Sequence, residues 1–316
     1  MPAPLIRVHN LTVGYSEETV LEQVSFDVHQ HEILGFVGLS GSGKTTLLKT
    51  LIGDVLPFEG EIQIITNHAE EKLQDNLKSF RKHVGFSAQS PSFYPELTVG
   101  ENLDFFAAMY GLTSLQQQQN TQVVLSLVGL ESSRSVLAKN LSGGMQKRLD
   151  IACSLIHGPK ILLLDEPTAD LDPVLRRQIL DVLKRINKRG TTLILVSHFL
   201  DEIVPICSRI GFLHNKNLLF MGTFYELKNT CAQEEEIHLE TAPGRYDAIL
   251  DRLTSKKNIV ITHSLNKGHM LVLYTPTSNA VLHELLHVLE ALHEDLLDIS
   301  LTKPTLTQIF EEMVKK

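Results

Sequence analysis

The octapeptide GLSGSGKT at residues 38–45 has residue types and a spacing that suit phosphate binding. It fits the pattern GxxxxGK[ST] and lies between an apolar run that suits a strand and the segment TTLLKTLIG, which suits a helix. Glycines let the backbone curl so that successive amides point at phosphate oxygens, Lys44 supplies positive charge to the β- and γ-phosphates, and the Thr45 hydroxyl can bind magnesium. The motif predicts a nucleotide site formed by Gly38, Leu39, Ser40, Gly41, Ser42, Gly43, Lys44, Thr45 and Thr46.

A second motif, ILLLDEP at residues 161–167, places two carboxylates at the end of an apolar run. Taken alone, this pattern fits an acidic turn at a strand end equally well. Beside a phosphate loop, it predicts the other half of a phosphoryl-transfer site, in which Asp165 binds Mg²⁺ and Glu166 polarises the attacking water. A general base of this kind typically contributes about 10²–10⁴-fold to the rate.

The stretch LSGGMQKRL at residues 141–149 has a serine and two glycines ahead of a predicted helix. Free backbone amides at such a helix start can hold an anion, and Ser142 is expected to cap the helix. The apolar side chains at helical spacing should anchor the helix on a core, namely Met145, Leu149, Ala152 and Ile156. Because a complete phosphate loop lies about a hundred residues earlier, this second anion-binding feature needs a separate explanation.

The elements around these motifs indicate an α/β fold. Residues 6–28 alternate in polarity around a GYSEE turn, which predicts an antiparallel N-terminal sheet. The runs 33–37, 161–164 and 193–196 are continuously apolar, as expected of parallel strands covered on both faces, and an amphipathic helix precedes the third run. We therefore predict a P-loop NTPase core with a mainly parallel sheet and an N-terminal antiparallel β-subdomain.

Two further parts complete the predicted organisation of a chain of 316 residues. Residues 75–157 are mostly helical, with a capping box at Thr98 and Glu101, and are interpreted as a helical subdomain inserted into residues 1–228. A polar linker at 229–235 leads to an accessory domain, 236–316, with the order βαββαβ of a small ferredoxin-like α+β layer. Its strands are expected at 237–240, 259–262, 270–274 and 297–301, its helices at 246–253 and 280–292, and a closing helix in LTQIFEEMV.

Composition narrows the class of protein. A net charge of −8 gives no basic field that would attract nucleic acid, so no nucleic-acid partner is expected. The three cysteines show no CxxC pairing, which suits a reducing compartment and argues against disulfides and a zinc site. No apolar run is long enough to cross a bilayer, and no secretory signal is visible at the N-terminus, so we expect a cytoplasmic protein.

With these motifs in place, residues 4–228 strongly resemble the ATPase subunits of ABC transporters, and LSGGMQ is similar to the signature of that family. Methionine replaces the glutamine most often found after the second glycine. The resemblance implies ATP and Mg²⁺ as ligands, adenine stacking on Tyr15, a magnesium and water contact at Gln89 in GFSAQS, and a γ-phosphate contact at His198. A tyrosine on a sheet edge is the alternative for Tyr15.

In this family the signature binds the γ-phosphate held by a second subunit. The resemblance therefore implies a head-to-tail dimer, homodimeric or with a related chain, in which Ser142, Gly143 and Gly144 act in trans. A chain of this family without membrane spans docks on a separate permease, here between Gln89 and Leu112, at the cytoplasmic face of the membrane. That segment and the C-terminal domain resemble the branch that exports drugs and polysaccharides.

Competing hypotheses come from other classes of protein. One is a soluble ABC-type ATPase acting on DNA or ribosomes, for which we find no heptads and no second set of motifs. Another is a regulatory nucleotide-binding module, although its active-site residues are all present. His283 and His287 could form a metal site, but without an HExxH order we favour surface or interface histidines. For the C-terminal domain, fold resemblance suggests only a dimer-stabilising or regulatory role.

Overall fold

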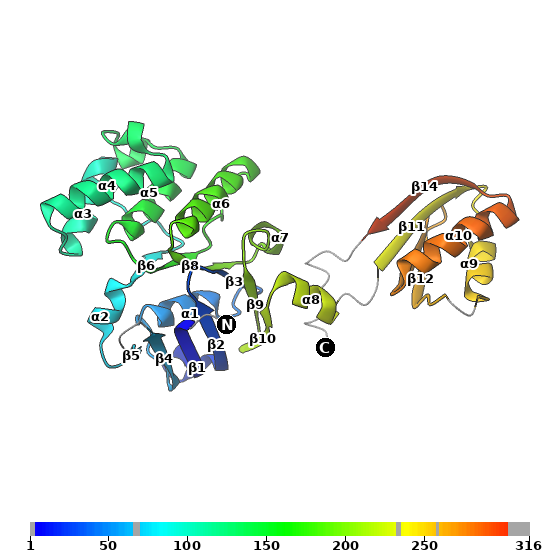
Figure 1. Ribbon diagram of the computed structural model, residues 1–316, viewed down its shortest axis with the longest axis horizontal. Helices are drawn as coiled ribbons and strands as arrows, with labels where there is room; N and C mark the ends of the chain where they lie inside the picture. Colours follow the sequence, from blue (N-terminus) through cyan, green and yellow to red (C-terminus); the bar gives the residue numbers. More distant parts are fainter. Residues whose placement is uncertain (1–3, 66–69, 232–234, 257–258, 303–316) are drawn as a thin grey trace. The chain divides into compact units, whose positions relative to one another are not determined.

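The computed structural model describes residues 4–65, 70–231, 235–256 and 259–302 of the chain. It divides into two compact units, residues 1–224 and 225–316 (Figure 1). Helix α8 (Phe224–Cys231) spans the predicted domain end at residue 228.

An antiparallel sheet forms the N-terminal part of the first unit, with strand order β2-β1-β4-β5. The GYSEE segment makes the turn between its first two strands, with Ser16 at φ 54°. Val24, Phe26 and Val28 are buried and alternate with more exposed neighbours, which confirms the predicted half-buried strand. The strands are β1 (Pro4–Tyr15), β2 (Glu18–His29), β4 (Glu59–Ile65) and β5 (Glu70–Lys72).

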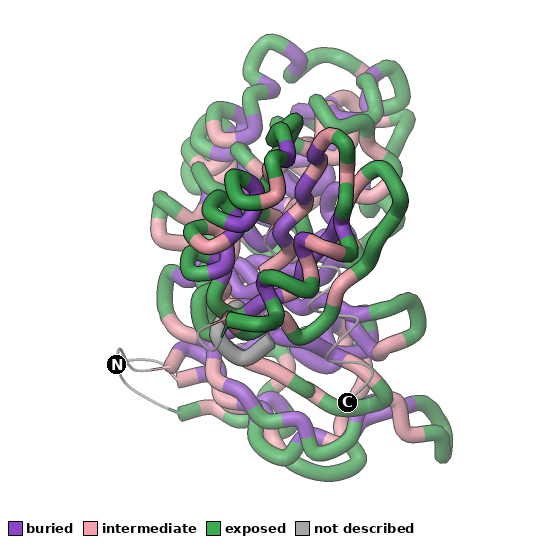
Figure 2. The backbone as a smooth tube through the Cα atoms, turned by 90° about the vertical axis from the view of Figure 1, so that its right-hand side faces the viewer, coloured by how far each residue is buried: buried purple, intermediate pink, exposed green. Residues whose placement is uncertain are grey.

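The central sheet has the strand order β10-β9-β3-β8-β7-β6. Only β10 runs antiparallel to its neighbour; the other pairs are parallel. Every residue of β3, β7 and β8 is buried, which confirms that the apolar runs are covered parallel strands. Figure 2 marks the buried segments of the chain in purple. The strands are β3 (Ile33–Val37), β6 (Val84–Ser87), β7 (Ile161–Asp165), β8 (Thr192–Ser197), β9 (Arg209–His214) and β10 (Asn217–Gly222).

Helices connect these parallel strands. Helix α1 (Lys44–Leu51) follows β3, α6 (Pro173–Lys188) joins β7 to β8, and α7 (Leu200–Ile203) follows β8. The helix is predicted from four apolar residues at helical spacing; Ile179, Leu183 and Ile186 are buried in α6, and Leu175 is half-buried. Asp172 caps its first turn by accepting from two backbone amides.

The inserted region is helical as predicted, and α3, α4 and α5 lie together with α6 in Figure 1. The capping box is present, because Thr98 and Glu101 exchange side-chain-to-backbone hydrogen bonds of 3.1 and 2.8 Å. Strand β6 was not expected here. Its sequence VGFS is too short for its period to be recognised, yet it forms the edge of the central sheet. The helices are α2 (Leu77–Lys82), α3 (Val99–Met109), α4 (Ser114–Val128) and α5 (Gly143–Leu155), with 3₁₀ turns at η1 (Glu131–Ser133) and η2 (Ala138–Asn140).

The second unit is a four-stranded sheet with the order β12-β13-β11-β14 and antiparallel neighbours. Two helices share its apolar core, so the predicted ferredoxin-like layer is confirmed. The second strand lies later than predicted, because Ile259 and Ile261 pack against the core while the next residues form the ladder. The predicted closing helix lies outside the described residues. The elements are β11 (Glu235–Ala242), α9 (Tyr246–Thr254), β12 (His263–Asn266), β13 (Leu271–Thr275), α10 (Ser278–Leu292) and β14 (Asp295–Thr302).

A buried carboxylate ties the start of α9 to the end of α10. The Glu294 side chain is fully buried and accepts hydrogen bonds from the Arg245 guanidinium at 2.8 Å and the Gly244 amide at 2.9 Å. Burial alone raises the pKa of Glu294, but the hydrogen bonds from Arg245 and Gly244 outweigh it and lower the pKa to about 2. Glu294 is therefore held as a carboxylate.

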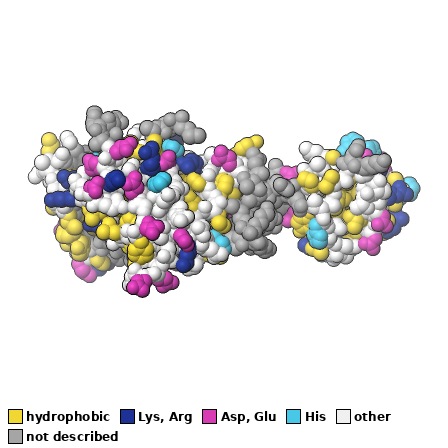
Figure 3. Space-filling model, turned by 90° about the horizontal axis from the view of Figure 1, so that it is seen from below, with side chains coloured by type: hydrophobic (Ala, Val, Ile, Leu, Met, Phe, Trp, Pro, Cys, Tyr) yellow, Lys and Arg dark blue, Asp and Glu magenta, His cyan; other side chains and the backbone are white. Residues whose placement is uncertain are grey.

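His283 and His287 lie one turn apart on the exposed face of α10, with ring centroids 5.0 Å apart. Figure 3 shows histidine side chains at the surface of this unit. Within the described ranges, no group of three His, Cys, Asp or Glu side chains is arranged to hold a metal ion. The structure thus adds no further ligand to this pair.

Candidate nucleotide-binding and hydrolysis site

The phosphate loop connects β3 to α1, and its backbone needs glycine at two points. Gly41 and Gly43 have φ angles of 80° and 94°, in the left-handed region that residues with a Cβ rarely adopt. The Lys44 ammonium group lies under the loop and donates to the carbonyl oxygens of Gly38 at 2.9 Å and Leu39 at 3.0 Å. These carbonyl contacts hold the lysine in the curled loop, ready to exchange them for phosphate oxygens.

Lys44 is buried, with charged groups nearby. Burial lowers the pKa of the Lys44 ammonium, while the negative charges of Glu166 and Asp165 raise it in part. A phosphate group entering the loop would favour the ammonium form further. The lysine is therefore placed where an anionic ligand gains the most from its charge.

Asp165 ends β7 directly beside α1, where its carboxylate accepts a hydrogen bond of 3.2 Å from the Thr45 hydroxyl. Burial raises the pKa of Asp165, and the hydrogen bond from Thr45 opposes that rise. Hydroxyl and carboxylate oxygens are the ligands that Mg²⁺ prefers, and Mg²⁺ in phosphate sites is held by few protein groups together with substrate phosphates and water. The residues present therefore fit this ion.

Glu166 and His198 form the next pair. A Glu166 carboxylate oxygen lies 2.9 Å from His198 Nδ1 and 3.4 Å from the His198 backbone amide. Glu166 has φ 48°, a left-handed conformation that turns its side chain out of the β7 strand direction, and its amide donates to the Val196 carbonyl oxygen. The ends of β7 and β8 thus bring together a candidate base and an imidazole.

A cluster beyond His198 supports its position. The His198 ring lies against the Phe199 ring with centroids 3.8 Å apart, and the Arg176 guanidinium lies over the Phe199 ring, 4.7 Å from its centroid. Arg176 also pairs with Glu202. Arg176 and Glu202 were not predicted from the sequence, because only the fold brings α6 next to α7.

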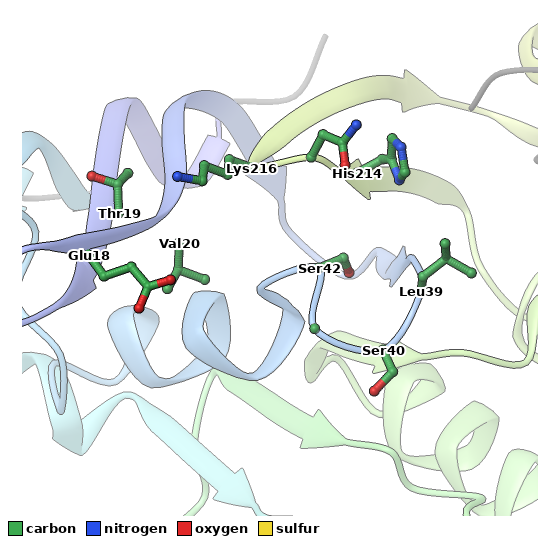
Figure 4. Close-up of a pocket in the computed structure, with 10 residues that line it drawn as sticks. Glu18, Thr19, Val20, Leu39, Ser40, Ser42, His214 and Lys216 are labelled. Carbon is green, nitrogen blue, oxygen red and sulfur yellow. The ribbon is translucent and has the colours of Figure 1, made fainter. Parts of the chain in front are cut away.

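Tyr15 lies at the end of β1, and 47% of its surface is exposed. Its hydroxyl is 3.5 Å from the Thr46 hydroxyl, which places the ring next to the helix that carries Lys44. A cavity of about 480 Å³ opens beside the phosphate loop (Figure 4). Lys44 and the two carboxylates do not line it, so it neighbours the hydrolysis centre rather than containing it. Its lining includes Val20, Leu39, Ser40, Gly41, Ser42 and Lys216.

The signature residues occupy the start of α5, a helix that Figure 1 places apart from α1. Ser142 caps the helix through the Met145 amide at 3.4 Å, as predicted. The two glycines differ: a Cβ on Gly143 would meet nothing within 4 Å, whereas one on Gly144 would lie 2.8 Å from a Leu175 methyl carbon. Gly143 thus leaves an open surface, and Gly144 permits close packing of α5 on α6.

Gln89 follows the end of β6 and is exposed. Within the described part of the chain, no hydrogen bond joins Gln89 to Asp165 or Glu166; instead, the residues around Gln89 are bound by α5. Lys147 and Asp150 of that helix, which were not predicted from the sequence, make these hydrogen bonds. The available signal was a pair of opposite charges three residues apart on one face of the predicted helix.

The geometry agrees with what the chain is similar to. Residues 21–169 match the model of the ABC transporter family. The chain is 33% identical over 224 residues to Nod factor export ATP-binding protein I of Ralstonia nicotianae, covering 71% of this chain and 68% of that one. It is 29% identical over 308 residues to the linearmycin resistance ATP-binding protein LnrL of Bacillus subtilis, covering 97% of both chains.

Other similar proteins are longer or known by structure. The probable multidrug ABC transporter ATP-binding protein YbhF of Escherichia coli is 34% identical over 73% of this chain, which spans 39% of YbhF. A solved structure of an ATP-binding subunit of an ABC transporter is 30% identical with a TM-score of 0.63, covering 72% of this chain and 92% of that one. The chain therefore belongs to the family of ABC transporter ATP-binding proteins, which are ATPases.

Proposed function

We propose that the chain is the ATP-hydrolysing motor subunit of an exporter and works as a head-to-tail dimer on a separate membrane permease. The observation that supports the dimer is the solvent-exposed N-terminus of α5. Ser142 and Gly143 are exposed there, on a helix apart from the phosphate loop of the same chain. A twofold partner would complete both sites at once, since each chain carries one copy of each half.

In the proposed mechanism, amides of the phosphate loop and Lys44 hold the β- and γ-phosphates of ATP, and Tyr15 stacks on the adenine. Thr45 and Asp165 would hold Mg²⁺, with Gln89 as a further contact, and the ion would neutralise charge that develops on the phosphates. Glu166 accepts the proton of the attacking water, and the 2.9 Å contact with His198 keeps its carboxylate in place. The His198 side chain is half-exposed, and we propose that its ring contacts the γ-phosphate.

Export is supported by the names of similar proteins, which include a Nod factor export ATP-binding protein and a linearmycin resistance ATP-binding protein. No helix in the part of the chain that the structure describes is long and apolar enough to cross a membrane. We propose that a permease supplies the membrane path and holds this chain at the cytoplasmic face. The second unit is proposed to stabilise the dimer or regulate it.

The permease is proposed to dock between Gln89 and Leu112. This segment exposes large apolar side chains, Tyr94, Phe105, Met109 and Tyr110, and 67% of the Met109 surface is open to solvent. The Tyr94 and Phe105 rings form an edge-to-face pair with centroids 4.7 Å apart. Exposed apolar side chains gathered in this way typically mark a protein interface.

A cavity at the end of this segment is lined by Tyr110, Gly111, Leu112 and His157. The Tyr110 and His157 rings stack at a centroid distance of 3.7 Å. Burial lowers the pKa of His157 to about 4, so the imidazole is neutral at physiological pH. This rigid aromatic wall would frame the docking surface.

The docking proposal is tested by copurification with the membrane protein of about six spans that a neighbouring gene should encode. Met109→Glu should abolish copurification and permease-stimulated ATP hydrolysis, because it puts a charge into an apolar contact. Leu219→Glu is the matched control, since Leu219 is also an exposed apolar residue but lies on β10, at the opposite edge of the central sheet. The proposed docking surface would be contradicted if both variants lost copurification equally, or if neither variant lost it.

A further inference from the structure

We propose that Asp150 is the positioning residue for Gln89: it fixes the loop that carries Gln89 to helix α5, the helix whose first residues face the partner's nucleotide. This inference rests on the proposed roles of Gln89 and Ser142. Its first test depends on neither, so the two can fail separately.

Asp150 lies in the third turn of α5 and has no exposed surface. One carboxylate oxygen accepts from the Ser87 hydroxyl, and the other accepts from the Ser92 amide and the Ser92 hydroxyl, both at 2.7 Å. A buried carboxylate is costly unless hydrogen bonds satisfy it, and bonds to an ionised acceptor are about twice as strong as neutral ones. All three of these donors belong to two residues on either side of Gln89.

Lys147 adds a fourth bond from the same helix face. It precedes Asp150 by one turn, and its ammonium group donates to the Ala88 carbonyl oxygen at 3.3 Å. Burial lowers the pKa of Lys147, and the charge of Asp150 opposes that shift. The chain is thus held at 87, 88 and 92, and Gln89 lies in the exposed stretch between these points.

The anchors connect two functional regions through one rigid element. Asp150 lies eight residues after Ser142, which is about 12 Å along an α-helix. Because a helix moves as a unit, a displacement at the start of α5 is carried to the Gln89 loop by Asp150 and Lys147. If the Asp150 carboxylate only stabilised the core, it would not need hydrogen-bond donors on both sides of the Gln89 loop.

The first test measures loop mobility. A nitroxide is attached at Ser90→Cys in the full chain with Cys231→Ser; Cys153 and Cys207 remain, because burial raises their thiol pKa and leaves them poorly reactive. Asp150→Ala should add a mobile component to the spectrum. Asp150→Asn, whose amide can still bond to both serines, should not.

Ser154→Ala is the matched control, because this buried hydroxyl lies one turn further along α5 and donates to the Ile151 carbonyl oxygen of its own helix rather than to the Gln89 loop. The inference would be overturned if Asp150→Ala left the nitroxide spectrum unchanged. It would also be overturned if Ser154→Ala increased the mobility of the nitroxide as much as Asp150→Ala does. If Asp150→Ala does not fold, Ser92→Ala removes one of the three donors and should increase mobility in the same direction.

The second test is a kinetic cycle with Gln89→Ala. Asp150→Ala should lower kcat for ATP hydrolysis by about tenfold, the loss expected when one charge-assisted hydrogen bond no longer orients a group. KM for ATP should stay within about twofold, because Lys44 and the phosphate loop are untouched. In the Gln89→Ala background Asp150→Ala should cause no further fall, since its effect passes through Gln89.

Independent, multiplicative losses in the double variant would refute the positioning role, because a merely structural defect adds to the loss of Gln89. A Gln89→Ala protein with unchanged kcat would instead remove the role proposed for Gln89. In that case Asp150→Ala should also leave kcat unchanged, and the nitroxide spectrum alone decides whether Asp150 anchors the loop.

Discussion

Glu166→Gln separates the chemistry of the base from its position. Glutamine has the size of glutamate, and its amide oxygen can still accept from His198 Nδ1, which lies 2.9 Å from the Glu166 carboxylate. It also tolerates the φ of 48° at this position no worse than glutamate does. The substitution therefore removes basicity and little else.

The expected loss follows from that single change. A general base contributes about 10²–10⁴-fold, so kcat should fall by this factor, or about 3–5 kcal/mol in activation free energy. ATP affinity should be retained, because Lys44 and the loop amides are unchanged. With the hydrolysis step stalled, the protein should accumulate as an ATP-dependent dimer.

Phosphate release at saturating ATP gives kcat, and size-exclusion chromatography with and without ATP gives the state of association. Glu166→Asp keeps a carboxylate but shortens the side chain by one methylene. It should lose less activity than Glu166→Gln, because aspartate can still accept a proton from water and glutamine cannot. A Glu166→Gln protein that hydrolyses ATP at the rate of the unsubstituted protein would refute the assignment of the base.

Four further outcomes follow from the same geometry. Lys44→Ala should weaken ATP binding at least tenfold in a direct titration, because a buried cation opposite the phosphates is lost. Ser142→Arg should disable the partner's site, so mixing it with Lys44→Ala should give mixed dimers with one occupied nucleotide site out of two, measurable by nucleotide occupancy. The pKa of His157 is lowered from 6.5 to about 4, so the unfolded chain binds a proton that the folded chain lacks. The free energy of unfolding is therefore independent of this residue's titration above pH 6.5 and falls as pH drops toward 4, by about 2 kcal/mol at pH 5. His157→Phe should remove that pH dependence, as measured by urea titrations. The pKa of Glu294 is lowered from 4.5 to about 2, so its contribution is present above pH 4.5 and is lost as pH falls through about 2. Glu294→Gln should lower the unfolding midpoint of the second unit at pH 7 and leave little difference near pH 2, as followed by circular dichroism.

The sequence predicted the structure well where a motif has a fixed spacing of reactive residues or where the pattern of apolar residues is long enough to show its period. Lys44, Thr45 and Asp165 are brought together because the carboxyl ends of parallel strands share one edge of the sheet, a rule that needs no coordinates. The capping box at Thr98 and Glu101 is local and was confirmed atom by atom. The first outcome follows from a general rule of parallel sheets, and the second from a motif of four consecutive residues.

Prediction failed where tertiary contacts decide. Strand β6 has only four residues, and pairing with β7 rather than its own pattern makes it a strand. In the second unit, Ile259 and Ile261 suit a strand, but they pack against the core, and β13 pairs with His263–Asn266 instead. Asp150 could not be assigned because its partners lie 58 and 63 residues away in sequence.

The two glycines at the start of α5 have different physical roles, although they belong to one family motif. Gly144 serves the packing of one chain, because a Cβ there would lie 2.8 Å from a Leu175 methyl carbon and that side chain would have to shift. Gly143 is not, because the space around its Cα is open, so within one chain an alanine would cost little there. A glycine that no intrachain contact demands points to something that approaches the backbone from outside. With Ser142 exposed beside it and Asp150 fixing the Gln89 loop further along the helix, that approach would be felt in the hydrolysis machinery of the chain that lends α5. In the proposed dimer, this connection would make hydrolysis in one site depend on occupancy of the other.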